Sequence, residues 1–161
     1  MRSDKFELQI VPEWDRIDET RDMVLKYLEN NNIQFEKAYS VGMIVSELLE
    51  NAIKYGKATA QSPVTLEIDI DNRELTVEMK NTILESNRYN LHKLDRTLQW
   101  FHSFQSPFEA YMEKLKEISS RDIRDRESGL GLVRIAYEGQ GNIDFYLDEN
   151  DMLCVSVVVS L

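Results

Sequence analysis

Apolar residues change their spacing along the chain, and each change predicts a secondary-structure element. In FELQIV, residues 6–11, apolar and polar residues alternate as in a half-buried strand. The spacing then lengthens to three and four residues, which predicts a helix from about 15 to 30. A second helix is predicted from Gln34 until Gly56 stops it. Its apolar stripe is formed by Ala38, Val41, Ile44, Val45, Leu48, Leu49, Ala52 and Ile53.

The middle of the chain predicts a hairpin followed by a helical insert. Residues 63–70 and 74–80 alternate apolar and polar side chains on either side of a three-residue turn, as in a β-hairpin. The highly charged stretch at about 84–126 comes next. It predicts one helix near 87–102 and another at 107–119, where the proline at the start of the second fits a first helical turn.

The end of the chain predicts a short helix and a closing hairpin. SGLGLVRIAYEG, residues 128–139, has a glycine turn before a helical pattern, and the last strands turn at 149–151. Because the strands cluster in hairpins, the fold class is α+β. We expect a two-layer sandwich, with a mixed, mostly antiparallel sheet and helices on one face. Residues 1–161 form a single domain in this interpretation.

Composition narrows the classes of partner and location. The chain has 161 residues, 42% of them hydrophobic, with 29 acidic and 19 basic residues and a net charge of -10. The negative field opposes nonspecific binding to nucleic acid or to an anionic membrane. No signal peptide is recognised, and no apolar run approaches the roughly 20 residues that span a bilayer, so we expect a cytoplasmic protein. The single cysteine, Cys154, is predicted to be a buried core thiol.

The second helix carries polar residues beside its apolar stripe. Glu47 and Asn51 are one turn apart, and Lys54 and Tyr55 continue the same face. An amide oxygen such as that of Asn51 can bind Mg²⁺, and Glu47 can orient or deprotonate a hydroxyl. Lys54 and Tyr55 can contact phosphate or ribose. The alternative is a solvated polar face, with Lys54 interacting with the helix dipole.

The segment SGLGL contains Ser128, Gly129, Leu130, Gly131 and Leu132. Two glycines that open a helix let backbone N–H groups approach an anion, and the helix N-terminus adds a favourable dipole. The serine can cap the helix or donate to a phosphate. A plain turn before a helix is the alternative.

Asn81 follows the strand at 74–80, and strand ends often face ligands. Its side chain can both donate to and accept from an adenine edge. The alternative is a turn residue that ends the strand.

Together these motifs resemble the GHKL (Bergerat-fold) superfamily of ATPases and kinases, over nearly the whole chain. The sharpest matches are its N-box, here Glu47 to Gly56, and its second glycine box, here Ser128 to Leu132. The resemblance implies ATP and Mg²⁺ as cofactors, with Glu47 as the general base and Asn51 as the metal ligand. The remaining nucleotide contacts that it implies are Lys54, Tyr55, Asn81, Ser128, Gly129, Leu130, Gly131 and Leu132.

The chain departs from the family at its first glycine box. Asn81 stands about where the family has an adenine-reading Asp, and no glycines follow it. The lid of the family is replaced by the longer insert at 84–126. This is similar to a divergent bacterial branch related to the small anti-sigma-factor serine kinases, whose better-known members act on STAS proteins.

Two functions of different class follow. The first is an ATP- and Mg²⁺-dependent serine/threonine kinase that phosphorylates a small STAS or anti-anti-sigma partner in a bacterial partner-switching system. The second is a degenerate binding module that sequesters a sigma factor or STAS protein without catalysis. An ATPase fragment that drives a conformational change is a third interpretation. A homodimer through the first strand is also compatible with the pattern.

The insert holds the remaining candidates. Its aromatic residues predict a small satellite core or a partner-docking surface, and its two histidines predict a solvated face rather than a metal site. The arginines of RDIRDR are either compensated by the neighbouring aspartates or reach an ATP phosphate. The aromatic residues are Trp100, Phe101, Phe104 and Phe108, and the histidines are His92 and His102. The arginines are Arg121, Arg124 and Arg126.

Overall fold

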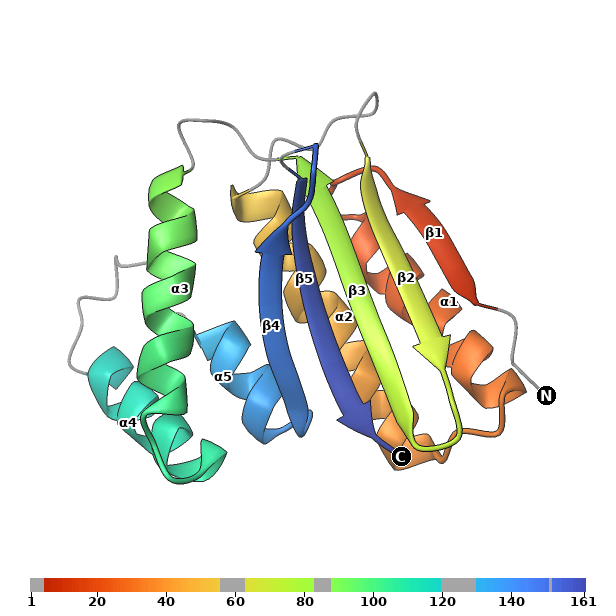
Figure 1. Cartoon of the computed structure of the whole chain (residues 1–161). Coiled ribbons are helices and arrows are strands. Elements are labelled where there is room, and N and C mark those ends of the chain that lie inside the picture. The colour runs from red at the N-terminus through yellow and green to blue at the C-terminus, as the bar shows by residue number, and fades with distance from the viewer. Residues whose placement is uncertain (1–4, 56–62, 83–87, 120–129, 151) are drawn as a thin grey trace.

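The predicted order of elements is confirmed. The structure, a computed structural model, describes residues 5–55, 63–82, 88–119, 130–150 and 152–161. Five strands and five helices lie in these residues (Figure 1). In chain order they are β1 (Phe6–Ile10), α1 (Arg16–Asn30), α2 (Phe35–Tyr55), β2 (Val64–Ile70), β3 (Glu74–Thr82), α3 (Arg88–His102), α4 (Pro107–Ser119), α5 (Leu130–Tyr137), β4 (Gly141–Leu147) and β5 (Met152–Ser160).

The strands form one sheet in the order β1-β2-β3-β5-β4, and all four pairings are antiparallel. Helices α1 and α2 lie behind the sheet, and α5 lies beside β4 (Figure 1). This two-layer α+β arrangement confirms the predicted fold class. The β2–β3 and β4–β5 pairs are hairpins, which makes them antiparallel. Helices α1 and α2 connect β1 to β2, and α3, α4 and α5 connect β3 to β4.

The core lies between α2 and the helix-facing side of the sheet. Alternation in β3 buries Leu75, Val77 and Met79 on this side, and the same row ends at Asn81. Facing them, the apolar stripe of α2 is buried over most of the helix. An amphipathic helix on a half-buried sheet removes both apolar faces from water, which is the main stabilising contribution to this architecture.

An aspartate side chain stabilises each of the two predicted hairpin turns. Asp71 Oδ1 accepts hydrogen bonds from the backbone N–H groups of Arg73 and Glu74, both at 2.8 Å, and these bonds lower the pKa of Asp71. Asp148 Oδ1 accepts in the same way from Asn150 and Met152 in the turn between β4 and β5. Both turns are therefore held by an aspartate, in the manner typical of Asx turns.

The insert contributes α3 and α4, which lie beyond β4 and α5 (Figure 1). The four aromatic residues that were predicted to cluster do not form a single group. The rings of Trp100 and Phe104 make an edge-to-face contact with their centroids 4.7 Å apart, whereas Phe101 packs against the main core. Phe108 is exposed and packs on Tyr137 of α5, with 5.5 Å between ring centroids. The satellite core is thus limited to one aromatic pair.

Cys154 is fully buried, as predicted. It is not part of the main core, however, because it lies on the opposite face of the sheet. It is opposite Lys80 of β3 and Tyr146 of β4 in the register. These residues occupy the face of the sheet away from α2, because Met79 and Val157 point toward the helices. The thiol interacts there with the side chain of Tyr146.

Among the helices that the structure describes, none combines the length and the apolar character needed to cross a membrane.

Candidate functional site

Helix α2 presents Glu47 and Asn51 at the border of the core. Leu48 and Leu49 between them are buried, whereas Glu47 and Asn51 are half-buried. The Glu47 side chain is 14% exposed. One helical turn separates the two polar residues, so they face the same region beside the sheet layer. The predicted placement of a carboxylate and an amide on one stripe is confirmed.

Gly131, the second residue of α5, lies against both of them. A Cβ added at Gly131 would lie 2.6 Å from Glu47 Oε2 and 4.0 Å from Asn51 Nδ2. The fold therefore brings together two motifs that are far apart in the sequence. A Cβ at this position would require the Glu47 carboxylate, the end of a flexible side chain, to move, and the missing side chain brings the first turn of α5 close to the two polar groups.

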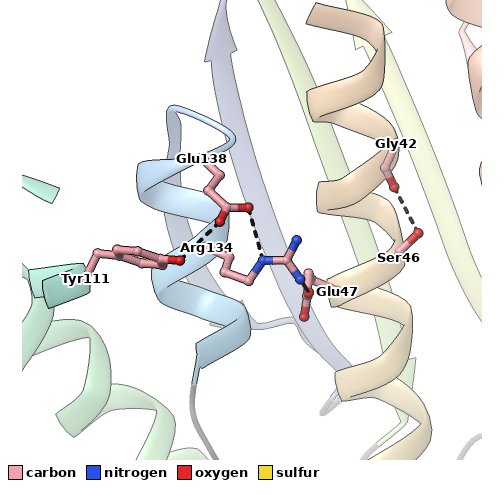
Figure 2. Close-up of polar contacts among 6 residues, drawn as sticks. All are labelled: Gly42, Ser46, Glu47, Tyr111, Arg134 and Glu138. Carbon is pink, nitrogen blue, oxygen red and sulfur yellow. Dashed lines mark hydrogen bonds and ion pairs between the residues drawn. The ribbon is translucent and has the colours of Figure 1, made fainter. Parts of the chain in front are cut away.

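Arg134 joins this group from the next turn of α5. Its Nη1 atom donates to Glu47 Oε1 at 2.7 Å, and its Nε atom donates to Glu138 Oε2 at 3.1 Å (Figure 2). Arg134 was not among the residues predicted for the site. A signal was present, because Arg134 is the one charged residue in LGLVRIAY, but no spacing rule links it to a glutamate in another helix.

Helix α4 of the insert reaches the same network. The Tyr111 hydroxyl donates to Glu138 Oε1 at 3.3 Å (Figure 2). The Tyr111 ring packs on the Tyr137 ring with centroids 5.0 Å apart. The insert is therefore connected to the site through the Tyr111 hydroxyl and through the packing of Tyr111 and Phe108 on Tyr137.

Burial raises the pKa of the Glu47 carboxyl. The positive charge of Arg134 opposes this rise, Glu50 adds to it, and Lys54 opposes it. Burial also acts to lower the pKa of Arg134, but Glu138 and Glu47 outweigh it and raise that pKa. Burial dominates the pKa of Glu47 but not that of Arg134, because the two side chains differ in exposure and in number of charged partners. The arginine side chain is 36% exposed and faces two carboxylates, whereas Glu47 is the more deeply buried partner.

Other predicted residues lie around this centre or in the neighbouring strand. Lys54 is exposed at the end of α2, close enough for its charge to act on Glu47. Leu132 packs against the core. Asn81 is 5% exposed and lies within β3, which runs to Thr82, so it does not follow the strand as expected. Its position in the row of Met79 points it toward the helix layer.

Several predicted residues fall outside what the structure describes. They are Ser128, Gly129, Arg121, Arg124 and Arg126, together with the side chains of Tyr55 and Leu130. In the described part of the chain, no group of three or more His, Cys, Asp and Glu side chains gathers as a metal site. His92 and His102 are both exposed on α3.

The described residues suit a nucleotide with Mg²⁺. Asn51 supplies an uncharged oxygen of the kind that binds Mg²⁺ beside phosphates. Gly131 supplies a helix start without a side chain, where backbone N–H groups and the helix dipole favour an anion. Glu47 supplies a carboxylate at the same place. A cavity of about 550 Å³ lies elsewhere, lined by residues of α3, α4, α5 and β4 that include Phe101, Phe108 and Tyr137. This cavity contains none of the residues predicted to bind the nucleotide.

Comparison with known proteins identifies the family of the chain and a solved structure of similar fold. Residues 10–137 match the family model described as the histidine kinase-like ATPase domain. Among solved structures, a chain in the crystal structure of the SiaB–SiaC complex from Pseudomonas aeruginosa is similar in fold, with a TM-score of 0.65 and 17% sequence identity. The match covers 99% of this chain and 91% of that chain. No curated protein matches this sequence.

Proposed function

The chain belongs to the histidine kinase-like ATPase domain family, and we propose that it is an ATP- and Mg²⁺-dependent serine/threonine kinase acting on a small partner protein. The observation that carries the proposal is the convergence of Glu47, Asn51 and Gly131. A carboxylate, an amide oxygen and a glycine in the first turn of a helix, gathered in one place, suit phosphoryl transfer, because this reaction depends mainly on positioning and charge neutralisation.

Each residue has a distinct role in this proposal. Asn51 holds Mg²⁺ through its amide oxygen, and the metal neutralises phosphate charge when bound. The backbone at Gly131 faces the phosphates, together with Ser128, Gly129, Leu130 and Leu132. Asn81 accepts from the adenine amine, while Lys54 and Tyr55 add contacts to phosphate or ribose.

Glu47 acts on the acceptor. In its ionised form it accepts a hydrogen bond from the serine or threonine hydroxyl of the partner, and it takes the proton that this hydroxyl loses. The raised pKa of Glu47 makes it a stronger base than an exposed glutamate. Arg134 keeps the carboxylate in place and limits that rise.

The partner is proposed from two observations. The solved structure of similar fold is a complex of two proteins, and this chain carries a helical insert with an exposed Phe108. We assign a small regulatory protein of the STAS type, in a partner-switching circuit of the cytoplasm. A homodimer through the edge strand β1 stays a prediction.

A non-catalytic binding module is the second candidate. Two observations favour it: Asn81 is neutral, so its bond to adenine lacks charge assistance, and Glu47 is already engaged by Arg134. In this case the same fold would bind a sigma factor or STAS protein without phosphorylating it.

The test is transfer of labelled phosphate from the γ-position of ATP to purified STAS-type proteins of the source organism, in the presence of Mg²⁺. We expect a phosphorylated serine or threonine with the wild type and none with Glu47→Ala, although both bind ATP. Glu36→Ala is the matched control, because Glu36 is exposed in the first turn of α2. Binding of a partner with no transfer by any variant would favour the second candidate.

A further inference from the structure

Three side-chain contacts connect the insert to Glu47 without a gap. Tyr111 of α4 donates to one oxygen of Glu138, whose other oxygen accepts from Arg134 Nε. Arg134 Nη1 then donates to Glu47 Oε1 of α2 (Figure 2). The path joins α4, α5 and α2. Each carboxylate oxygen in it accepts a hydrogen bond from one of these side chains.

The geometry of Arg134 explains how it can orient a carboxylate. A guanidinium is planar and its N–H groups point in fixed directions, so holding one edge fixes the other. Glu138 is four residues further on, directly after the last residue of α5, and holds the Nε edge. Nη1 then holds Glu47 Oε1 and leaves Oε2 on the side of Gly131.

Tyr111 has the corresponding effect on Glu138. A long glutamate side chain on a helix surface has several rotamers, and a second hydrogen bond restricts them. The Tyr111 hydroxyl supplies that bond from α4. Burial, together with the neighbouring Glu138, raises the pKa of Tyr111, so the hydroxyl keeps its proton and stays a donor at neutral pH. The rings of Phe108 and Tyr111 both pack on Tyr137, which fixes α4 against α5.

We infer that Arg134 is a positioning residue for Glu47, and that Tyr111 of the insert sets the position of Arg134 through Glu138. The insert thereby acts on the carboxylate from a distance, in addition to any role as a lid. The consequence for phosphoryl transfer rests on the proposed kinase function, whereas the relay itself does not.

The first measurement is therefore independent of activity. The side-chain Nε–Hε signal of Arg134 is assigned in ¹⁵N-labelled wild-type protein, in Tyr111→Phe and in Tyr137→Phe. Both substitutions remove a hydroxyl and keep a ring, but only Tyr111 belongs to the relay. We expect the Arg134 signal to shift and its hydrogen to exchange faster with water in Tyr111→Phe, with little change in Tyr137→Phe. Equal spectra for the two variants would overturn the relay.

The second measurement is the split between kcat and KM for ATP. Loss of one hydrogen bond in the relay predicts a fall in kcat of about three- to tenfold for Tyr111→Phe, with KM for ATP unchanged. Arg134→Met is expected to lose on the order of 100-fold in kcat, and Arg134→Lys to recover part of it. If kcat is unchanged in both Arg134 variants, the positioning role is wrong. If the wild type transfers no phosphate, the kinase proposal fails, and the Arg134 signal still decides the relay.

Discussion

The Oε2 atom of Glu47 lies where a side chain on residue 131 would have to start: a Cβ there would be 2.6 Å from it. Gly131 is inside a helix, so its backbone does not require glycine. The requirement comes from the neighbouring helix α2. Glu47 is the end of a flexible side chain, but the ion pair with Arg134 restricts its movement. This contact brings the two motifs of the candidate site together.

Gly131→Ala is expected to displace the Glu47 carboxylate and to lower the free energy of unfolding by about 1–3 kcal/mol, as overpacking usually does. Urea denaturation measures the change. In a double-mutant cycle, Glu47→Ala should remove most of this cost, because it removes the atom that the new methyl group meets.

Gly42→Ala is the matched control for that substitution. Gly42 lies inside α2, where a Cβ would meet only the flexible side chains of Arg21 and Leu25 at 3.3 Å. Alanine is favoured over glycine in a helix by about 1 kcal/mol. We expect Gly42→Ala to be neutral or stabilising. A Gly131→Ala protein as stable as Gly42→Ala would show that the site is more open than the 2.6 Å approach indicates.

Glu47→Gln tests the cost of burying the carboxylate. The folded-state pKa of Glu47 is raised above its ordinary value of 4.5, so folding favours the protonated form. The contribution of Glu47 to stability is therefore fully present below pH 4.5 and is lost as pH rises through the folded pKa. Glutamine does not titrate. The stability of Glu47→Gln relative to wild type should thus increase from pH 4.5 to neutral pH. An opposite trend would mean that Arg134 outweighs burial.

Asn81→Asp tests the proposal that Asn81 occupies the adenine-reading position, where the resemblance implies an Asp. If Asn81 reads adenine, an ionised acceptor should tighten ATP binding by about three- to tenfold. Without nucleotide, the buried carboxylate should lower the free energy of unfolding by about 1–3 kcal/mol. Calorimetric titration with ATP gives the first quantity and urea denaturation the second. Asn142→Asp, on an exposed position of β4, should change neither. Weaker ATP binding by Asn81→Asp would remove Asn81 from the site.

Cys154 is expected to react slowly with a thiol reagent at pH 8. Burial raises the pKa of its thiol, and the side chain is fully buried beside Tyr146. The hydrogen bond to Cys154, with burial, raises the pKa of Tyr146 to about 12. Tyr146→Ala should speed the reaction by tenfold or more, since it uncovers the sulfur. Tyr39→Ala, at an exposed position of α2, should leave the rate unchanged. Fast reaction of the wild type would contradict the burial.

The part of the site that lies on one helix could be predicted from the sequence. Glu47 and Asn51 share a face because a helix repeats every 3.6 residues, and this rule needs no tertiary information. Their approach to Gly131 followed only from the resemblance to a known superfamily. Arg134 could not be paired with Glu47 in this way, because the contact depends on how α5 packs on α2.

The face of β5 on which Cys154 lies could not be predicted from the sequence either. The run MLCVSVVVSL is apolar at nearly every position, so alternation does not tell which side Cys154 occupies. The register with Lys80 and Tyr146 decides it. In β3 the alternation predicted for residues 74–80 is regular, and it matches the burial of Leu75, Val77 and Met79 on one face.

The most direct test of the candidate site is calorimetric titration with ATP, with and without Mg²⁺, of wild type, Asn51→Ala and the exposed control Asn142→Ala. We predict that Mg²⁺ increases the affinity of wild type and of Asn142→Ala for ATP. In Asn51→Ala we predict that the affinity for ATP no longer depends on Mg²⁺. Wild-type protein that binds no ATP at millimolar concentration, or an Asn51→Ala protein that keeps the full effect of Mg²⁺, would contradict it.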